Sequence, residues 1–137
     1  MQDFTIKDLQ SLLPMDEKNI ILFERYDGVR FILERSLAKY EDDICIYASH
    51  WKNEIKKMIN ANNVDLLITE LSKANPDGLE LSRYARKISP ELKILWITVL
   101  GCDEFRKQRE LLGNIRCAEK PLKIQDFRED VLEALEI

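Results

Sequence analysis

Residues 64–78, VDLLITELSKANPDG, constrain the fold more than any other stretch of the chain. The run 64–69 is nearly all apolar and rich in β-branched side chains, which is typical of a strand buried on both faces of a parallel sheet. Glu70 stands where this run ends, and the turn residues 75–78 lead into an amphipathic helix. Open α/β sheets place their functional sites at such a junction.

Four other short apolar runs alternate with segments in which apolar residues recur at helical spacing. The predicted strands are 19–23, 44–47, 64–69, 94–97 and 115–118. Strands that alternate with helices over short connections favour right-handed crossovers and a parallel sheet covered on both faces. The sequence therefore predicts an α/β fold of the flavodoxin-like (βα)5 type, a doubly wound sandwich around a parallel five-stranded sheet of order 2-1-3-4-5.

A length of 137 residues suits one such domain, which we assign to residues 19–137. Residues 1–18 are predicted to form an N-terminal extension with a short helix, because four apolar side chains share a face there: Ile6, Leu9, Leu12 and Leu13. The extension either packs on the domain or serves as an arm for self-association.

The net charge and the cysteine content indicate which partners the protein can bind and which cellular compartment suits it. The net charge of −4 disfavours a nucleic-acid surface, and no apolar stretch is long enough for a membrane span. Three cysteines without metal-like spacing fit a reducing cytoplasm better than a disulfide framework. We therefore expect a cytoplasmic protein with neither a nucleic-acid nor a membrane partner.

In the predicted strand order, the carboxyl ends of strands 1, 3, 4 and 5 lie together at one edge of the sheet. Five polar side chains should meet there: Glu24, Arg25, Glu70, Thr98 and Lys120. Their order along the chain, with Asp77-Gly78 seven and eight residues after Glu70 and Pro121 after Lys120, resembles that of CheY-like response-regulator receiver domains. The resemblance covers about residues 19–137.

The resemblance implies a role for each of these positions. Receiver domains accept a phosphoryl group from a histidine kinase on an aspartate, and that position is Glu70 here. The Mg²⁺ positions, two acidic residues and one backbone carbonyl, correspond to Glu24, Arg25 and Ser72. Thr98, Lys120 and Pro121 occupy the positions that contact the phosphoryl group or follow that contact. Cys117 occupies the position where the family has a switch aromatic.

The departures from the family pattern concern the chemistry of phosphorylation. Glu24 and Glu70 balance Arg25 and Lys120 in charge without a metal ion, so Arg25 can replace the ion and Mg²⁺ binding should be weak or absent. A glutamate also places its oxygen one methylene too far for in-line attack. We expect no enzyme, no cofactor and a signalling module that works through protein contacts without conventional phosphorylation.

Two alternatives stay within this family. In one, the site has decayed and Glu70 only forms a salt bridge with Lys120 or Arg25, and in the other Glu70 is still phosphorylated. The extra reach of Glu70 could also bring its carboxylate to Thr98 and imitate a phosphorylated aspartate.

The resemblance also implies a partner surface, formed by helix 4, strand 5 and helix 5 of the predicted domain. The fourth helix, 103–112, has a thin apolar stripe, and a partner is expected at Phe105, Leu111 and Leu112. Candidate partners are a sensor kinase, an output protein or a second copy of the chain.

Two rival functions come from other classes. A flavin or other cofactor would need a phosphate-binding loop after strand 1, but residues 24–28 carry carboxylates on both sides of Arg25. A thiol-redox sensor cannot use Cys45 with Cys117, since these lie at opposite edges of the predicted sheet. Cys102 could lie near Cys117, although we expect buried structural cysteines.

Overall fold

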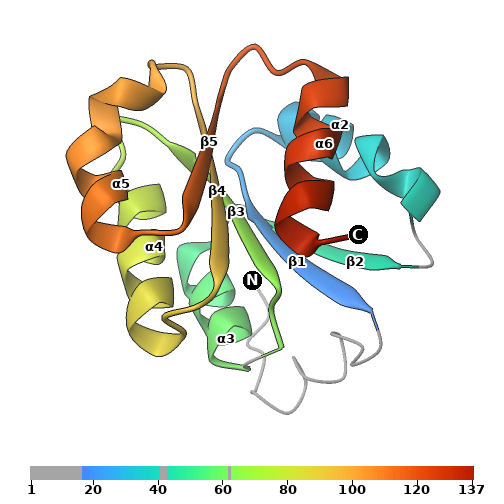
Figure 1. Ribbon diagram of the computed structural model, residues 1–137, viewed down its shortest axis with the longest axis horizontal. Helices are drawn as coiled ribbons and strands as arrows, with labels where there is room; N and C mark the ends of the chain where they lie inside the picture. The colour runs from blue at the N-terminus through green and yellow to red at the C-terminus, as the bar shows by residue number, and fades with distance from the viewer. Residues whose placement is uncertain (1–16, 41–42, 62) are drawn as a thin grey trace.

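The computed structural model describes residues 17–40, 43–61 and 63–137. A parallel five-stranded sheet forms its centre, with the strand order β2-β1-β3-β4-β5 that the sequence predicts (Figure 1). The strands are β1 (Lys18–Phe23), β2 (Ile44–Ser49), β3 (Leu66–Leu71), β4 (Lys93–Thr98) and β5 (Ile115–Glu119). The helix predicted within residues 1–18 lies outside the described residues.

In the described part of the chain, five α-helices cover the two faces of the sheet. They are α2 (Asp27–Ser36), α3 (Lys52–Asn60), α4 (Asp77–Ile88), α5 (Arg106–Leu112) and α6 (Ile124–Leu135), with short 3-10 helices η1 (Ala38–Tyr40) and η2 (Cys102–Phe105). Helices α3, α4 and α5 lie on one face, and α2 and α6 lie on the other (Figure 1). The flavodoxin-like doubly wound fold is thereby confirmed.

The core consists of two apolar layers, because successive side chains of each strand point to opposite faces of the sheet. Side chains such as Phe23, Leu67 and Trp96 pack toward α3, α4 and α5. Their neighbours, such as Leu22 and Ile68, pack toward α2 and α6. Burial on both faces explains why the central strands read as almost continuous apolar runs.

All five strands differ from their predicted bounds by one or two residues, and two differences bear on the site and its surroundings. β3 extends to Leu71, so Glu70 is part of the strand, where it pairs in register with Ile97. The predicted helix 103–112 is divided into η2 and α5, and Phe105 at the division is only 7% exposed and edge-on to Trp96. Phe105 therefore belongs to the core, which corrects its assignment to a partner surface.

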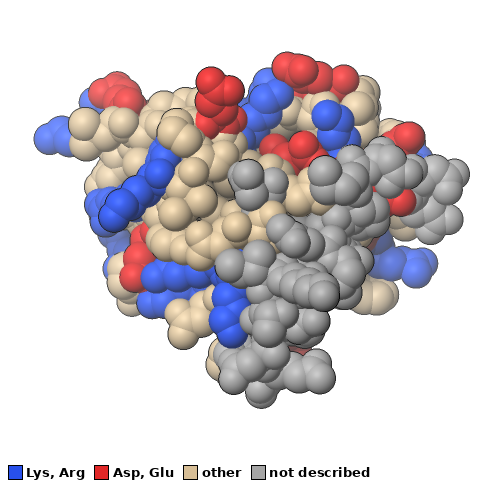
Figure 2. Space-filling view, turned by 90° about the horizontal axis from the view of Figure 1, so that it is seen from below, with Lys and Arg blue, Asp and Glu red and all other residues tan. Residues whose placement is uncertain are grey.

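The amino-terminal end of the sheet carries both signs of charge (Figure 2). At this end the Lys93 amine lies 3.1 Å from a carboxylate oxygen of Glu136. Among the described residues, no helix is long and apolar enough to cross a membrane.

Candidate functional site

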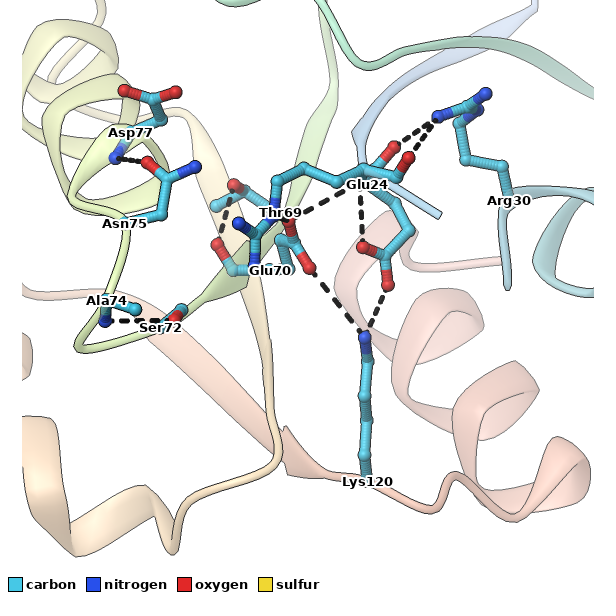
Figure 3. A network of polar contacts seen from close by, with 10 residues as sticks. Glu24, Arg30, Thr69, Glu70, Ser72, Ala74, Asn75, Asp77 and Lys120 are labelled. Carbon is cyan, nitrogen blue, oxygen red and sulfur yellow. Dashed lines mark hydrogen bonds and ion pairs between the residues drawn. The ribbon is translucent and has the colours of Figure 1, made fainter. Parts of the chain in front are cut away.

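The carboxyl edge of the sheet holds the predicted cluster of charged side chains. Glu24 and Arg25 follow β1 directly, Glu70 is next to the last residue of β3, and Lys120 follows β5. In Figure 3 the Lys120 side chain extends from its loop to the carboxylates of Glu24 and Glu70. Of the five side chains predicted to meet at this edge, these four form ion pairs with one another.

Glu24 is the most buried member of this cluster, with no exposed surface. One of its carboxylate oxygens forms an ion pair with the Lys120 amine. The other accepts a hydrogen bond of 2.9 Å from the backbone N–H of Arg25. A buried carboxylate is tolerated because both of its oxygens have partners.

Glu70 is contacted by two cations. Its Oε1 accepts a hydrogen bond of 2.5 Å from Arg25 Nε, and its Oε2 lies 3.8 Å from the Lys120 amine. The salt bridge of Glu70 that belongs to the decayed-site alternative, with Lys120 or Arg25, is present with both cations. The carboxylate is directed to these two cations, and each of its oxygens has a partner there.

The two carboxyls differ in proton affinity. Burial, together with the neighbouring Glu70 carboxylate, raises the pKa of Glu24 to about 7 against the opposing effect of Lys120. Burial also acts to raise the pKa of Glu70, but its interactions with Glu24 and Arg25 outweigh burial and lower that pKa. The pair thus holds a proton mainly on Glu24 as the pH falls below 7.

Arg30 supports this cluster and was missed by sequence reasoning. Its Nη1 donates hydrogen bonds to the carbonyl oxygens of Glu24 at 2.6 Å and Arg25 at 3.2 Å, and its Nη2 forms an ion pair with Asp27. Side chains on a helix tilt toward its amino terminus. The basic residue in the first turn of α2 was therefore the sequence signal that could have predicted these contacts with the backbone after β1.

Gly78 explains the Asp-Gly pair in the predicted motif. A Cβ at this position would lie 1.9 Å from the backbone oxygen of Glu70, far inside van der Waals contact. Only glycine lets the start of α4 pass so close to β3. Pro76 is the N-cap residue of α4 and forms no side-chain cap, and the Asn75 side chain accepts a hydrogen bond of 2.9 Å from the Asp77 N–H.

The β4 side of the edge is held by hydrogen bonds around Thr98. This threonine is buried, and its hydroxyl oxygen accepts a hydrogen bond of 3.1 Å from the Leu100 N–H. Its carbonyl accepts one of 2.7 Å from the Lys120 N–H, immediately before Pro121, whose peptide bond is cis. Ser72 lies just beyond β3, and its hydroxyl oxygen accepts the Ala74 N–H at 3.1 Å.

Cys117, at the predicted switch position on β5, is bonded to Cys102 in η2. The predicted proximity of these two cysteines is confirmed, whereas the expectation of unlinked buried cysteines is wrong for this pair. Cys45 lies on β2 at the far edge of the sheet, as predicted.

The charged cluster offers a metal ion few free ligands. Within the described ranges, no group of three or more histidine, cysteine, aspartate or glutamate side chains is arranged to hold a metal ion. Arg25 stands where the resemblance places a second acidic ligand, and the carboxylates of Glu24 and Glu70 already contact cations. The arrangement can neutralise its own charges without a bound ion.

Comparison with known proteins identifies relatives in sequence. No protein-family model matches the chain. The chain is 25% identical over 120 residues to the response regulator receiver protein CpdR of Brucella abortus (strain 2308), and the alignment covers 86% of this chain and 97% of the relative.

Solved structures share the fold. A response regulator receiver protein from Sinorhizobium medicae WSM419 superposes with a TM-score of 0.76 at 19% identity, covering 90% of this chain and 98% of the other. The REC domain of AraT, a response regulator from Geobacillus stearothermophilus, gives a TM-score of 0.72 at 26% identity and covers 87% and 93%.

Proposed function

Since the chain is a CheY-like receiver domain and a signalling module of the response-regulator type, we propose that it signals through protein contacts without conventional aspartyl phosphorylation. The observation that carries this proposal is the engagement of Glu70 by two cations. Its Oε1 is bonded to Arg25 and its Oε2 faces Lys120. Attack on a phosphodonor would require this carboxylate to leave Arg25, and its longer side chain would still misplace the attacking oxygen.

Weak or absent Mg²⁺ binding is part of the proposal. The ion prefers several oxygen ligands in octahedral geometry. The Arg25 guanidinium forms an ion pair with Glu70 Oε1, and the Lys120 amine forms one with the Glu24 carboxylate. A divalent ion would compete with both cations and add positive charge beside them, so the donor set does not fit Mg²⁺ well.

We further propose that the module is not an enzyme and that its partner binds the face formed by α5, β5 and α6. Leu111 on α5 is 86% exposed, which leaves a large apolar side chain uncovered there. The charged residues of α5 are mainly basic, and those of α6 are mainly acidic. Such a face suits a sensor kinase, an output protein or a second copy of the chain related by two-fold symmetry.

Intact mass after incubation with a small-molecule phosphodonor and Mg²⁺ tests the proposal. The wild type should gain no phosphoryl group. The variant Arg25→Asp with Glu70→Asp should gain one, because it restores an acidic pair and an acceptor of normal length. A phosphoryl adduct on wild-type Glu70 would overturn the proposal.

A titration with Mg²⁺ tests the metal argument separately. Trp96 has no exposed surface and lies two residues before Thr98 on β4. In a Trp51→Phe background its fluorescence should stay constant in the wild-type site. The Arg25→Asp, Glu70→Asp site should give a saturable change, and a saturable change with Arg25 and Glu70 in place would contradict weak binding.

A further inference from the structure

We propose that Cys102 and Cys117 form a reversible disulfide through which low-molecular-weight thiols control the loop after Thr98. The two Cα atoms are 6.0 Å apart and the sulfur atoms are bonded. Cys102 opens η2, and Cys117 lies on β5 at the edge of the sheet. This redox role goes beyond the proposed signalling function and does not depend on it.

The disulfide is placed where a thiol can reach it. Both cysteines are only half-buried, and β5 has no strand on its outer side among the described residues. Cys45, the third cysteine, lies on β2, where burial raises the pKa of its thiol. A raised pKa leaves less thiolate for exchange, so Cys45 competes poorly with the Cys102–Cys117 pair.

The bonded loop is attached directly to the site. The Leu100 N–H donates to the Thr98 hydroxyl oxygen at 3.1 Å, and the Cys102 N–H donates to a carboxylate oxygen of Glu119 at 3.0 Å. Val99, between Thr98 and Leu100, is 71% exposed and contributes little packing. The disulfide therefore restrains a short segment whose backbone fixes the orientation of the Thr98 hydroxyl.

Reduction should loosen this segment without unfolding the helix that follows. Phe105 at the end of η2 is buried, and its ring lies 6.2 Å from that of Trp96 in an edge-on contact. This anchor does not involve the disulfide. Loss of the bond would leave the loop between Thr98 and Phe105 held only by hydrogen bonds such as that from Cys102 to Glu119, so the Leu100 donor should be less firmly fixed at the Thr98 hydroxyl.

The redox step balances with two small thiols. One thiolate attacks a protein sulfur, forms a mixed disulfide and releases the other cysteine as a thiolate. A second small thiolate attacks the small-molecule sulfur of that mixed disulfide and releases the remaining cysteine. Two electrons pass from the small thiols to the protein, both cysteines take up protons to become thiols, and a small-molecule disulfide leaves.

Redox titration in glutathione buffers tests the proposal in a Cys45→Ser background. Quenching with a maleimide and measuring intact mass should show two alkylations under reducing buffer and none under oxidising buffer. With methyl-labelled threonine, the NMR signal of Thr98 should shift with the same midpoint. Thr69, buried on β3, is the matched control and should keep its position.

A second variant keeps the proposal testable whatever the midpoint. Cys102→Ser with Cys117→Ser should show the reduced-state Thr98 signal in every buffer, with amide exchange at Leu100 about tenfold faster than in the oxidised protein. The proposal is overturned if glutathione disulfide fails to bond the pair. It is also overturned if the Thr98 signal is the same in both redox states.

Discussion

The two halves of the carboxyl edge are held in place by different chemistry. Around β1 and β3, the carboxylates of Glu24 and Glu70 are fixed by the side chains of Arg25 and Lys120. Around β4 and β5, the loop after Thr98 is fixed by a covalent bond. The first arrangement responds to protons and the second to thiols, so neighbouring parts of one site can be perturbed independently.

Removing the cation from the buried carboxylate should have the largest effect. Lys120→Met leaves Glu24 buried without its ion-pair partner. The free energy of unfolding should fall by about 4 kcal/mol at a pH well above the pKa of Glu24. The loss should be smaller at acidic pH, where Glu24 takes up a proton. Urea unfolding at the two pH values measures both.

Lys73→Met is the matched control for this change. Lys73 pairs with Glu104 at 3.0 Å, but both side chains are largely exposed. Its removal should cost less than about 1 kcal/mol at either pH. Equal losses for the two lysine variants would mean that the buried ion pair of Lys120 contributes no more to stability than an exposed ion pair.

Reduction of the disulfide, which holds the half of the edge around β4 and β5, should have the next largest effect. The disulfide closes a loop with a sequence separation of 15 residues, and its reduction should lower the free energy of unfolding by about 3 kcal/mol. Urea unfolding with and without a reducing thiol measures this loss. Cys45→Ser should respond to the thiol as the wild type does, whereas Cys102→Ser with Cys117→Ser should not respond at all.

The pH dependence of the free energy of unfolding, which arises in the charged half, should be about as large as the effect of the disulfide. The pKa of Glu24 is raised from 4.5 to about 7, so the folded protein binds more protons than the unfolded chain between these values. Stability should therefore fall by about 3 kcal/mol as the pH rises through this window. The lowered pKa of Glu70 acts in the opposite sense, its contribution being lost only as the pH falls below 4.5.

Glu24→Gln removes the titrating group, so the fall in stability across this window should become flat. Glu110→Gln on the exposed surface of α5 is the control and should keep the wild-type slope. An unchanged slope in Glu24→Gln would assign the pH dependence to another group.

The smallest effect is expected outside both halves. Leu111→Lys replaces an exposed side chain on α5, and the free energy of unfolding should change by less than about 0.5 kcal/mol. If the face formed by α5, β5 and α6 joins two copies of the chain, sedimentation should show weaker self-association in this variant. A large loss of stability would show that Leu111 belongs to the core.

Much of the fold could be predicted because the apolar runs are short, regular and separated by turn residues. The meeting of Glu24, Glu70 and Lys120 followed from the strand order alone, since parallel strands end at a common edge. The partners within the site were harder to predict. Glu70 had more than one cation within reach, and only the three-dimensional packing shows that it contacts both Arg25 and Lys120.

Other features carried a weak signal or none. The bond between Cys102 and Cys117 depends on how the loop after β4 turns back to β5, which apolar periodicity does not encode. Phe105 was assigned to a partner surface because residues 103–112 carry a thin apolar stripe, and the division of this segment into η2 and α5 was not predicted. The hydrogen bonds of Arg30 to the backbone after β1 could be inferred only from its position in the first turn of α2.

The close approach at Gly78 joins α4 to the site mechanically. With the Glu70 oxygen where a Cβ would lie, the start of α4 and the end of β3 cannot shift past each other separately. Ser82 extends the link, because its hydroxyl donates to the Gly78 carbonyl at 2.8 Å and accepts the Trp96 indole N–H at 2.8 Å. A displacement of α4 should therefore move β3 and β4 together, and with them both halves of the carboxyl edge.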